Sequence, residues 1–315
     1  MLVTGGAGFI GSHLIERLLT EGHEVTCLDN FSDFYDPVVK RKNIRPFLKN
    51  KKFTLLEADI MDKETLQKLF QEFRFDKIIH FAAQPGVRLS WQKPDLYMDI
   101  NVRGTLNILE LVKEFSIKSL IFGSSSSVYG ATEVIPFSED GELKPISPYG
   151  VSKRTGELLC AAYHHLYKIP TVILRFFSVY GPRQRPDMAI HKFIRLIDEG
   201  KRICLYGSGQ SKRDYTCVED IIDGVVSALD RDFDFETFNL GNSEPISLGH
   251  LISIIESCLG KKAVIEHLPE QPGDPFVTYA SIEKSGRLLN YRPKVKINEG
   301  IERFMEWYKA EKNGN

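Results

Sequence analysis

The chain has few cysteines and no close pair of them. Its five cysteines are widely spread, and none stands in a Cys-x-x-Cys pair. This pattern is typical neither of a disulfide framework nor of a zinc site, and it favours a reducing compartment. The eight histidines offer no metal-ligand spacing either. We therefore expect a protein without a metal site.

Long hydrophobic runs and an excess of one charge are also absent. No apolar stretch approaches the length that a bilayer-spanning helix needs, and the chain opens on a strand and a glycine loop, without a basic and then apolar leader. The net charge of -1 gives no general attraction to nucleic acid or to an anionic membrane. We expect a cytoplasmic protein with neither of these partners.

Short apolar segments alternate with amphipathic ones through the first two thirds of the chain. This alternation predicts an α/β fold with a doubly wound, parallel (Rossmann) sheet. The predicted strands are Leu2–Thr4, Glu24–Leu28, Phe53–Ala58, Lys77–Phe81, Lys118–Phe122 and Thr171–Phe176. The predicted helices between them include Ser12–Thr20, Lys63–Phe73, Asn101–Glu114 and Tyr149–Tyr167.

The pattern changes in the last third of the chain. Proline-containing loops at 182–186 and 269–275 interrupt shorter elements, and Ile297–Lys309 is again helical with one apolar face. A chain of 315 residues is near the size at which a single core stops growing. We expect a larger domain over residues 1–175 and a smaller one over 176–315, some segments of which return to the sheet.

The basic residues 40–42 and 49–52 form the only marked charge cluster of the sequence. Runs of this kind usually lie on a solvated surface, and we interpret the cluster in this way.

A glycine loop follows the first predicted strand. The segment Thr4–Gly11 has Gly5, Gly8 and Gly11 in phase, and a helical pattern follows it. Such a loop presents backbone N–H groups at a helix N-terminus, where they bind a dinucleotide pyrophosphate. Asp29 ends the next strand, and its carboxylate could accept hydrogen bonds from the adenosine ribose and repel the extra phosphate of NADP. We predict NAD, and a capping or turn role is the alternative for Asp29.

Tyr149 and Lys153 lie one helical turn apart, where a helix begins at the carboxyl edge of the sheet. A phenol with a pKa of about 10 is a poor base at neutral pH. A neighbouring ammonium group and a positive nicotinamide ring would lower that pKa and allow the phenolate to act on a sugar hydroxyl. Ser125 ends the preceding strand and can share a hydrogen bond with that hydroxyl, although serines here could instead only satisfy a turn.

The spacing of tyrosine and lysine is a weak signal by itself, because Tyr308 and Lys312 repeat it near the C-terminus. That second pair has no glycine loop near it, and we interpret it as a surface pair. We assign the following residues to the cofactor site: Gly5, Gly8, Phe9, Ile10, Gly11, Asp29, Asn30, Asp59, Ile60, Ala82, Tyr149 and Lys153.

Four segments together resemble the extended short-chain dehydrogenase/reductase family that modifies nucleotide sugars: 4–11, 123–130, 149–153 and 175–182. The resemblance spans nearly the whole chain. It implies Ser125, Tyr149 and Lys153 as catalytic residues, and NAD that is retained between turnovers. It also implies that residues 1–175 bind NAD and that residues 176–315 mainly bind the nucleotide sugar.

The resemblance further implies a homodimer in which helices 101–114 and 149–167 pair with their symmetry mates. The first helix offers Leu106, Leu109 and Val112, and the second offers Leu158, Leu159 and Leu166. This is more apolar surface than one face of a sheet needs.

Ser126 and Ser127 stand where similar enzymes that eliminate water or lose carbon dioxide carry an acidic residue. Without that proton donor, a redox-neutral 4-epimerase is favoured. Segments 30–37, 84–88, 181–188 and 271–274 resemble UDP-glucuronate 4-epimerases in particular.

Arginine can hold a carboxylate through two parallel hydrogen bonds. Arg185, together with Arg88, is therefore our candidate for binding the C6 carboxylate, and two solvated arginines are the alternative. The resemblance implies that Arg213 contacts the UDP pyrophosphate and that Gln271 and Asp274 lie near the uridine ribose. Ser126, Ser127 and Ser178 complete the predicted substrate site.

The sequence thus predicts NAD-dependent interconversion of UDP-glucuronate and UDP-galacturonate through a transient 4-keto intermediate. UDP-glucose/UDP-galactose 4-epimerisation is the alternative. A UDP-glucuronate decarboxylase and a non-catalytic NAD-binding module are less favoured, because fold alone does not decide function and the three catalytic residues are intact.

Overall fold

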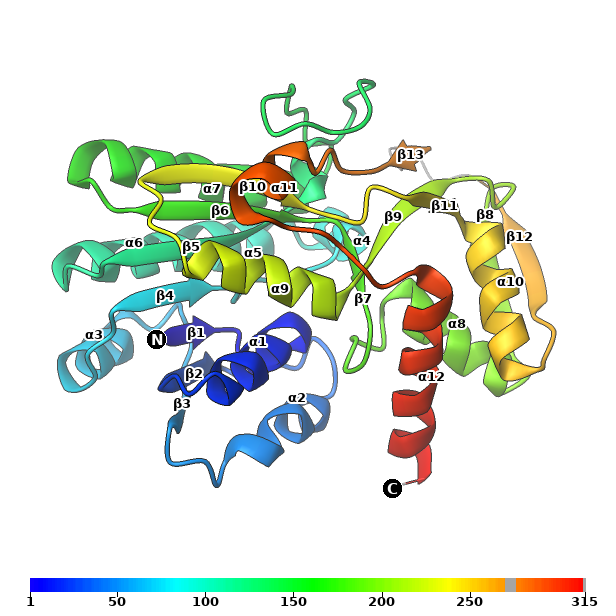
Figure 1. Cartoon of the computed structure of the whole chain (residues 1–315), viewed down its shortest axis with the longest axis horizontal. Helices are drawn as coiled ribbons and strands as arrows, with labels where there is room; N and C mark the ends of the chain where they lie inside the picture. The colour runs from blue at the N-terminus through cyan, green and yellow to red at the C-terminus, as the bar shows by residue number, and fades with distance from the viewer. Residues whose placement is uncertain (270–275, 314–315) are drawn as a thin grey trace.

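The computed structural model of the chain describes residues 1–269 and 276–313. Its larger lobe contains a seven-stranded parallel sheet with the strand order β10-β6-β5-β4-β1-β2-β3 (Figure 1). The chain starts in the middle of this sheet and winds outward in both directions, which makes it a doubly wound Rossmann sheet. The strands are β1 (Leu2–Thr4), β2 (Val25–Asp29), β3 (Phe53–Glu57), β4 (Lys77–His80), β5 (Ser119–Ser125), β6 (Thr171–Phe176) and β10 (Phe235–Leu240).

The sheet is buried on both faces, because successive side chains of a strand point in opposite directions. In β1, Val3 packs into the core on one face and Leu2 into the core on the other. Ile79 and Ile78 do the same in β4. Because neither face meets solvent, these strands are continuous apolar runs in the sequence.

Helices cover both faces of the sheet. The core on the Val3 side includes α1 (Phe9–Thr20), α2 (Pro37–Ile44), α9 (Val218–Leu229) and α11 (Glu283–Leu289). The opposite core includes α3 (Lys63–Glu72), α6 (Gly104–Glu114) and α7 (Pro148–Tyr167). The short helices α4 (Val87–Gln92) and α5 (Pro94–Tyr97) and a π-helical turn over Met98–Arg103 lead into α6. Short 3-10 turns cover Arg45–Phe47 and Ser126–Val128.

A smaller lobe lies beside the sheet, on the right in Figure 1. Its core contains Phe193, Leu251 and Phe304, one from each of three helices. These helices are α8 (Ala189–Asp198), α10 (Leu248–Leu259) and α12 (Ile297–Asn313), the last of which has the predicted apolar face. The strands of this lobe are β7 (Ser178–Tyr180), β8 (Arg202–Tyr206), β9 (Lys212–Cys217), β11 (Pro245–Ser247), β12 (Val264–Leu268) and β13 (Val277–Thr278).

The structure confirms the predicted fold class and adds one strand to the sheet. β10 comes from far along the chain and pairs in parallel with β6. Its sequence contains Glu236 and Asn239, so it is not an apolar run. Asn239 is fully buried, and its side-chain Oδ1 accepts a hydrogen bond from the Tyr129 hydroxyl at 2.7 Å. Pairing with distant partners therefore makes this segment a strand.

All five cysteines are free, and Cys27, Cys160 and Cys217 are buried. In the described part of the chain, no helix is both long enough and apolar enough to cross a bilayer.

Candidate active site

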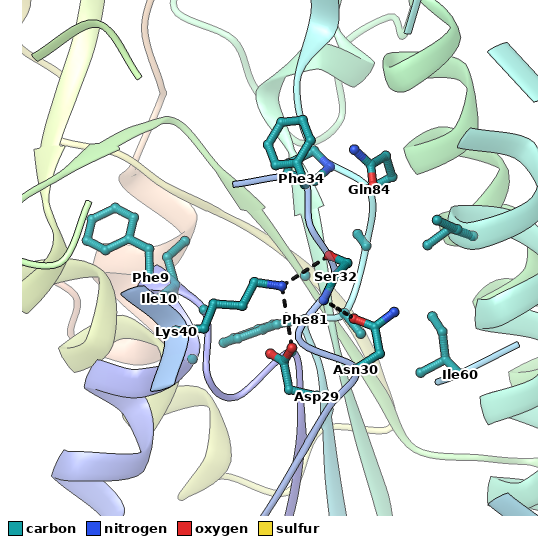
Figure 2. A pocket seen from close by; sticks show the side chains of 18 of the residues that line it. Phe9, Ile10, Asp29, Asn30, Ser32, Phe34, Lys40, Ile60, Phe81 and Gln84 are labelled. Carbon is teal, nitrogen blue, oxygen red and sulfur yellow. Dashed lines mark hydrogen bonds and ion pairs between the residues drawn. The ribbon is translucent and has the colours of Figure 1, made fainter. Parts of the chain in front are cut away.

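One cleft lies at the carboxyl ends of the central strands, where ligands bind in doubly wound folds. Figure 2 shows this cleft from close by, with side chains from β2, the segment after it, and the loop after β4. All residues that we assigned to the cofactor site line it: Gly5, Gly8, Phe9, Ile10, Gly11, Asp29, Asn30, Asp59, Ile60, Ala82, Tyr149 and Lys153.

The glycine loop is shaped for a close approach of its backbone to a ligand. Gly5 has a φ of +67°, and a Cβ atom on Gly11 would lie 2.4 Å from the Gly5 carbonyl oxygen. Glycine at these positions therefore lets the loop pack against the first turn of α1. Among the described residues, no side chain caps that turn. Its N–H groups remain available to an anion, so the loop fits a dinucleotide pyrophosphate.

Asp29 ends β2 at the far end of the cleft. Its Oδ2 accepts a hydrogen bond from the Ala7 N–H at 3.2 Å, and its Oδ1 accepts one from the Phe31 N–H at 2.9 Å. Asn30, the next residue, donates to Asp59 Oδ2 at 2.8 Å. The two aspartates that we predicted for the adenosine end of NAD thus follow neighbouring strands: Asp29 ends β2, and Asp59 comes two residues after β3 and is linked to Asn30.

Lys40 departs from our interpretation of the basic cluster, whereas the other basic residues of 40–42 and 49–52 are exposed as expected. We expected 40–42 on a solvated surface, but Lys40 is only 7% exposed and lines the cleft. Its Nζ lies 3.5 Å from Asp29 Oδ1 and 3.1 Å from Ser32 Oγ (Figure 2). In α2, Lys40 shares the buried face with Asn43 and Ile44, three and four residues later. That helical spacing was the signal in the sequence that we missed.

The start of α7 positions the predicted catalytic pair. Ser147 caps the helix by accepting a hydrogen bond from the Gly150 N–H at 3.0 Å, and Pro148 occupies the first turn. Tyr149 and Lys153 follow and both reach the cleft. Lys153 Nζ donates to the Gly123 carbonyl at 2.8 Å, which fixes the ammonium group against β5.

Burial has the largest effect on the pKa values of Tyr149 and Lys153. Burial raises the pKa of Tyr149, while a hydrogen bond from Ser125 and the charge of Arg185 lower it. Burial also lowers the pKa of Lys153 to about 8. We expected the ammonium group to depress the pKa of Tyr149, but in the protein by itself the opposite effect of burial is larger. A phenolate therefore needs further positive charge beside it.

Asn101 is a site residue that the sequence analysis missed. It lies on the π-helical turn before α6, a type of turn that often marks functional sites. Its side chain accepts from the Gln84 N–H at 2.6 Å and donates to the Gln84 carbonyl at 3.0 Å. It also donates to Ser152 Oγ at 2.9 Å. Asn101 thereby fixes the loop after β4 against α7.

Arg185 lines the same cleft as Tyr149, from the loop that follows β7. Its Nε and Nη2 donate to the two carboxylate oxygens of Asp187, each at 3.0 Å. The guanidinium carbon lies 5.5 Å from the centre of the Phe34 ring. The preceding residue, Gln184, is buried and donates to the β7 backbone at 3.0 Å. The loop therefore presents an oriented cation beside Tyr149.

In the described part of the chain, neither the predicted catalytic Ser125 nor the remaining predicted substrate residues line this cleft: Arg88, Ser126, Ser127, Ser178 and Arg213. The guanidinium of Arg88, from α4, lies 4.5 Å from the ring centre of Tyr206 in the smaller lobe. Arg213 lies on β9, where it donates to a backbone carbonyl at 2.8 Å. Gln271 and Asp274 lie outside the described residues.

Tyr308 and Lys312 behave as the predicted surface pair. Lys312 Nζ lies 2.7 Å from Asp198 Oδ2, and the Tyr308 hydroxyl lies 3.4 Å from the same atom. Both residues thus connect α12 to α8, away from the cleft.

The Rossmann sheet, the glycine loop and the Tyr-x-x-x-Lys helix at the carboxyl edge define an extended short-chain dehydrogenase/reductase. Residues 2–304 match the family model described as GDP-mannose 4,6 dehydratase, and the chain belongs to this family. The family that the sequence resembles is thereby confirmed.

Similar proteins cover nearly the whole chain. It is 42% identical to the UDP-glucuronate 4-epimerase of Thermodesulfobacterium geofontis, over 98% of this chain and 95% of that protein. The crystal structure of UDP-glucuronic acid 4-epimerase from Bacillus cereus, in complex with UDP-glucuronic acid and NAD, is similar with a TM-score of 0.93. Identity is 41%, and 98% of each chain is covered. UDP-glucose 4-epimerase from Thermotoga maritima has a TM-score of 0.91 and 29% identity, again over 98% of each chain.

Proposed function

We propose that the protein is an NAD-dependent UDP-sugar 4-epimerase, an isomerase, and that its sugar is UDP-glucuronate. The position of Arg185 beside Tyr149 in the cofactor cleft carries this proposal, because it places a cation near the reacting hydroxyl. Similarity to UDP-glucuronate 4-epimerases, at 42% and 41% identity over 98% of this chain, supports it.

The residues of the cleft suit NAD. The glycine loop would hold the pyrophosphate, and Asp29 and Asp59 would meet the adenosine. The bound cofactor would supply a hydride acceptor and the positive ring that Tyr149 needs in order to ionise. Tyr149 then takes the proton of the C4 hydroxyl, Ser125 orients that hydroxyl, and Lys153 stabilises the phenolate. The 4-keto sugar would then turn its other face toward the cofactor, and the same residues would return the proton to the C4 oxygen.

Oxidation at C4 makes the sugar a β-keto acid, which loses carbon dioxide when the carboxylate bond aligns with the ketone π-system. Arg185 would hold the carboxylate out of this alignment. Asp187 already fixes the Nε edge of the guanidinium group. Among the described residues only Asp187 is hydrogen-bonded to this guanidinium, so its other edge could bind a substrate carboxylate.

The test incubates purified protein with UDP-glucuronate and, separately, with UDP-glucose, both without added NAD, and identifies products by NMR. We expect UDP-galacturonate from the first substrate and little reaction of the second. Faster conversion of UDP-glucose would favour the alternative epimerase. UDP-pentose from the unaltered protein would indicate a decarboxylase, and no product from either sugar would contradict the proposal.

Arg185→Ala tests the sugar assignment. Loss of a charged hydrogen bond costs about 1.5–3 kcal/mol, so KM for UDP-glucuronate should rise roughly ten- to a hundredfold, with UDP-pentose as a by-product. The KM for UDP-glucose should change much less, because a neutral hexose lacks the carboxylate, whereas a lower rate through the lost charge beside Tyr149 would be common to both sugars. Arg195→Ala, on the exposed side of α8, is the control. An equal rise in KM for both sugars would show that Arg185 has another role.

We also propose that the protein is a homodimer built on α7. Leu158 and Leu166 are 53% and 64% exposed on this helix, and Val151 lies on the same side. Among the residues that we expected from α6, Leu109 and Val112 are buried in the core of their own chain, so α6 contributes less than predicted.

The free cysteines agree with our further proposal of a cytoplasmic location.

A further inference from the structure

A buried carboxylate lies one helical turn beyond Lys153 on α7. Glu157 is 1% exposed, and its Oε1 accepts hydrogen bonds from Ser124 Oγ at 2.6 Å and from Arg175 Nε at 2.9 Å. Its Oε2 accepts from Arg175 Nη2 at 3.0 Å and from Arg154 Nη1 at 2.9 Å. Both oxygens are therefore satisfied.

The partners of Glu157 fix it as an anion. Burial opposes its ionisation, but hydrogen bonds and charge from Arg175, with further donors from Ser124 and Arg154, hold the pKa of Glu157 below its usual range. Arg175 is itself 3% exposed on β6 and also donates to the Tyr129 hydroxyl at 2.9 Å. The carboxylate is thus held between α7, β5 and β6.

The charged and titratable groups around Lys153 make Glu157 its main source of negative charge. Burial lowers the pKa of Lys153 to about 8, and Glu157 opposes this most strongly. His80 on β4 is kept neutral, because burial lowers its pKa to about 3. Burial raises the pKa of the Cys160 thiol, so that group is also neutral. Tyr149 lies one turn before Lys153, and β5 contacts the ammonium through the Gly123 carbonyl.

We propose that Glu157 is a positioning residue for catalysis, which keeps Lys153 protonated at working pH and holds the end of β5 through Ser124. The proposal rests on the catalytic role proposed for Lys153. Ser124 immediately precedes Ser125, so the same carboxylate orders both the cation and the strand end that carries the predicted serine. A buried ion pair is weak evidence for stability, because burying its charges costs about as much as their attraction returns. The proposed role beside Lys153 explains why the buried ion pair of Glu157 and Arg175 is present in this protein.

The experiment compares the pH dependence of epimerisation in the unaltered protein and in Glu157→Gln. Glutamine keeps the shape and an acceptor oxygen but removes the charge. Since Glu157 raises the pKa of Lys153, its loss should move the alkaline limb of the pH profile downward by about one pH unit, the low end for a neighbouring charge. A merely structural role would lower the rate without moving this limb.

Arg154→Gln provides a test of opposite sign. Arg154 partly neutralises Glu157, so its removal should strengthen the field at Lys153 and move the alkaline limb to higher pH. Its side chain is 34% exposed, and this variant should fold even if Glu157→Gln does not. Arg303→Gln, which removes a paired arginine from the surface of α12, is the matched control and should leave the limb in place.

Titration of Lys153 Nζ by NMR in ¹⁵N-lysine-labelled protein, assigned with Lys153→Met, gives a readout that does not depend on the sugar. We expect the titration to shift downward in Glu157→Gln and upward in Arg154→Gln. Unchanged midpoints in folded variants would overturn this inference, even if UDP-glucuronate is epimerised. Shifted midpoints in the variants, together with no epimerisation by the unaltered protein, would instead contradict only the proposed function.

Discussion

Tyr149 and Tyr308 each precede a lysine by four residues, but their surroundings give them different chemistry. Tyr149 lies in the cleft with a hydrogen bond from Ser125 and the charge of Arg185, both of which favour the phenolate. Burial raises the pKa of both phenols, and at Tyr308 the carboxylate of Asp198 raises it further. We therefore expect Tyr149, and not Tyr308, to act as a base once further positive charge lies beside it.

Tyr149→Phe should lower the rate of epimerisation by about 10²–10⁴-fold, because it removes a positioned acid–base group and little else. The rate of product formation by NMR measures the effect, and the NAD content reports that the cleft is intact. Tyr308→Phe is the matched control and should retain nearly the full rate. Near-normal turnover in Tyr149→Phe would reject its assignment as the base.

The glycine loop shows how one element depends on another. The first turn of α1 lies against Gly5 and Gly6, so the space for a side chain at Gly11 is filled by backbone atoms. Asn43 of α2 donates to the Ala7 carbonyl at 3.1 Å and closes the loop from the other side. The loop is thereby held in the shape that its N–H groups need for a phosphate.

Gly11→Ala should therefore release the cofactor. Its Cβ would lie 2.4 Å from the Gly5 carbonyl oxygen and 2.7 Å from Gly6 Cα, and these backbone atoms cannot rotate away. We expect overpacking to cost about 1–3 kcal/mol of stability, measured by denaturant unfolding, and the purified protein to lose its NAD absorbance. Gly286→Ala, which meets only one atom at 3.7 Å, is the control. Full NAD content in Gly11→Ala would argue against this loop as the pyrophosphate site.

At the scale of the whole molecule, exposed apolar side chains lie on both lobes. Leu158 and Leu166 project from α7 on the larger lobe, and Val264 is 53% exposed on β12 in the smaller lobe. α6 and α7 pack together, and the Tyr163 hydroxyl donates to Glu110 between them. α7, with its exposed apolar side chains, and the α6 helix packed beside it could form a four-helix interface around a twofold axis.

Light scattering at micromolar concentration should give twice the mass of one chain. Leu158→Glu should shift the protein toward monomers, because it buries a charge in the interface. Val264→Glu changes an equally exposed residue on the smaller lobe and should leave the dimer intact. A monomeric unaltered protein, or dissociation by both variants, would contradict an interface on α7.

The sequence by itself determined the features that depend on local spacing. Six strands follow from apolar runs, and the glycine loop, Asp29 and the Tyr149–Lys153 pair lie within or next to single elements, where periodicity predicts their positions. Only the tertiary structure decided which distant segments meet. β10 becomes a strand through its pairing with β6, Lys40 turns inward because its helix packs on the glycine loop, and Arg185 reaches Tyr149 from another lobe. These contacts join residues far apart in the chain, and no local pattern encodes the packing that brings them together.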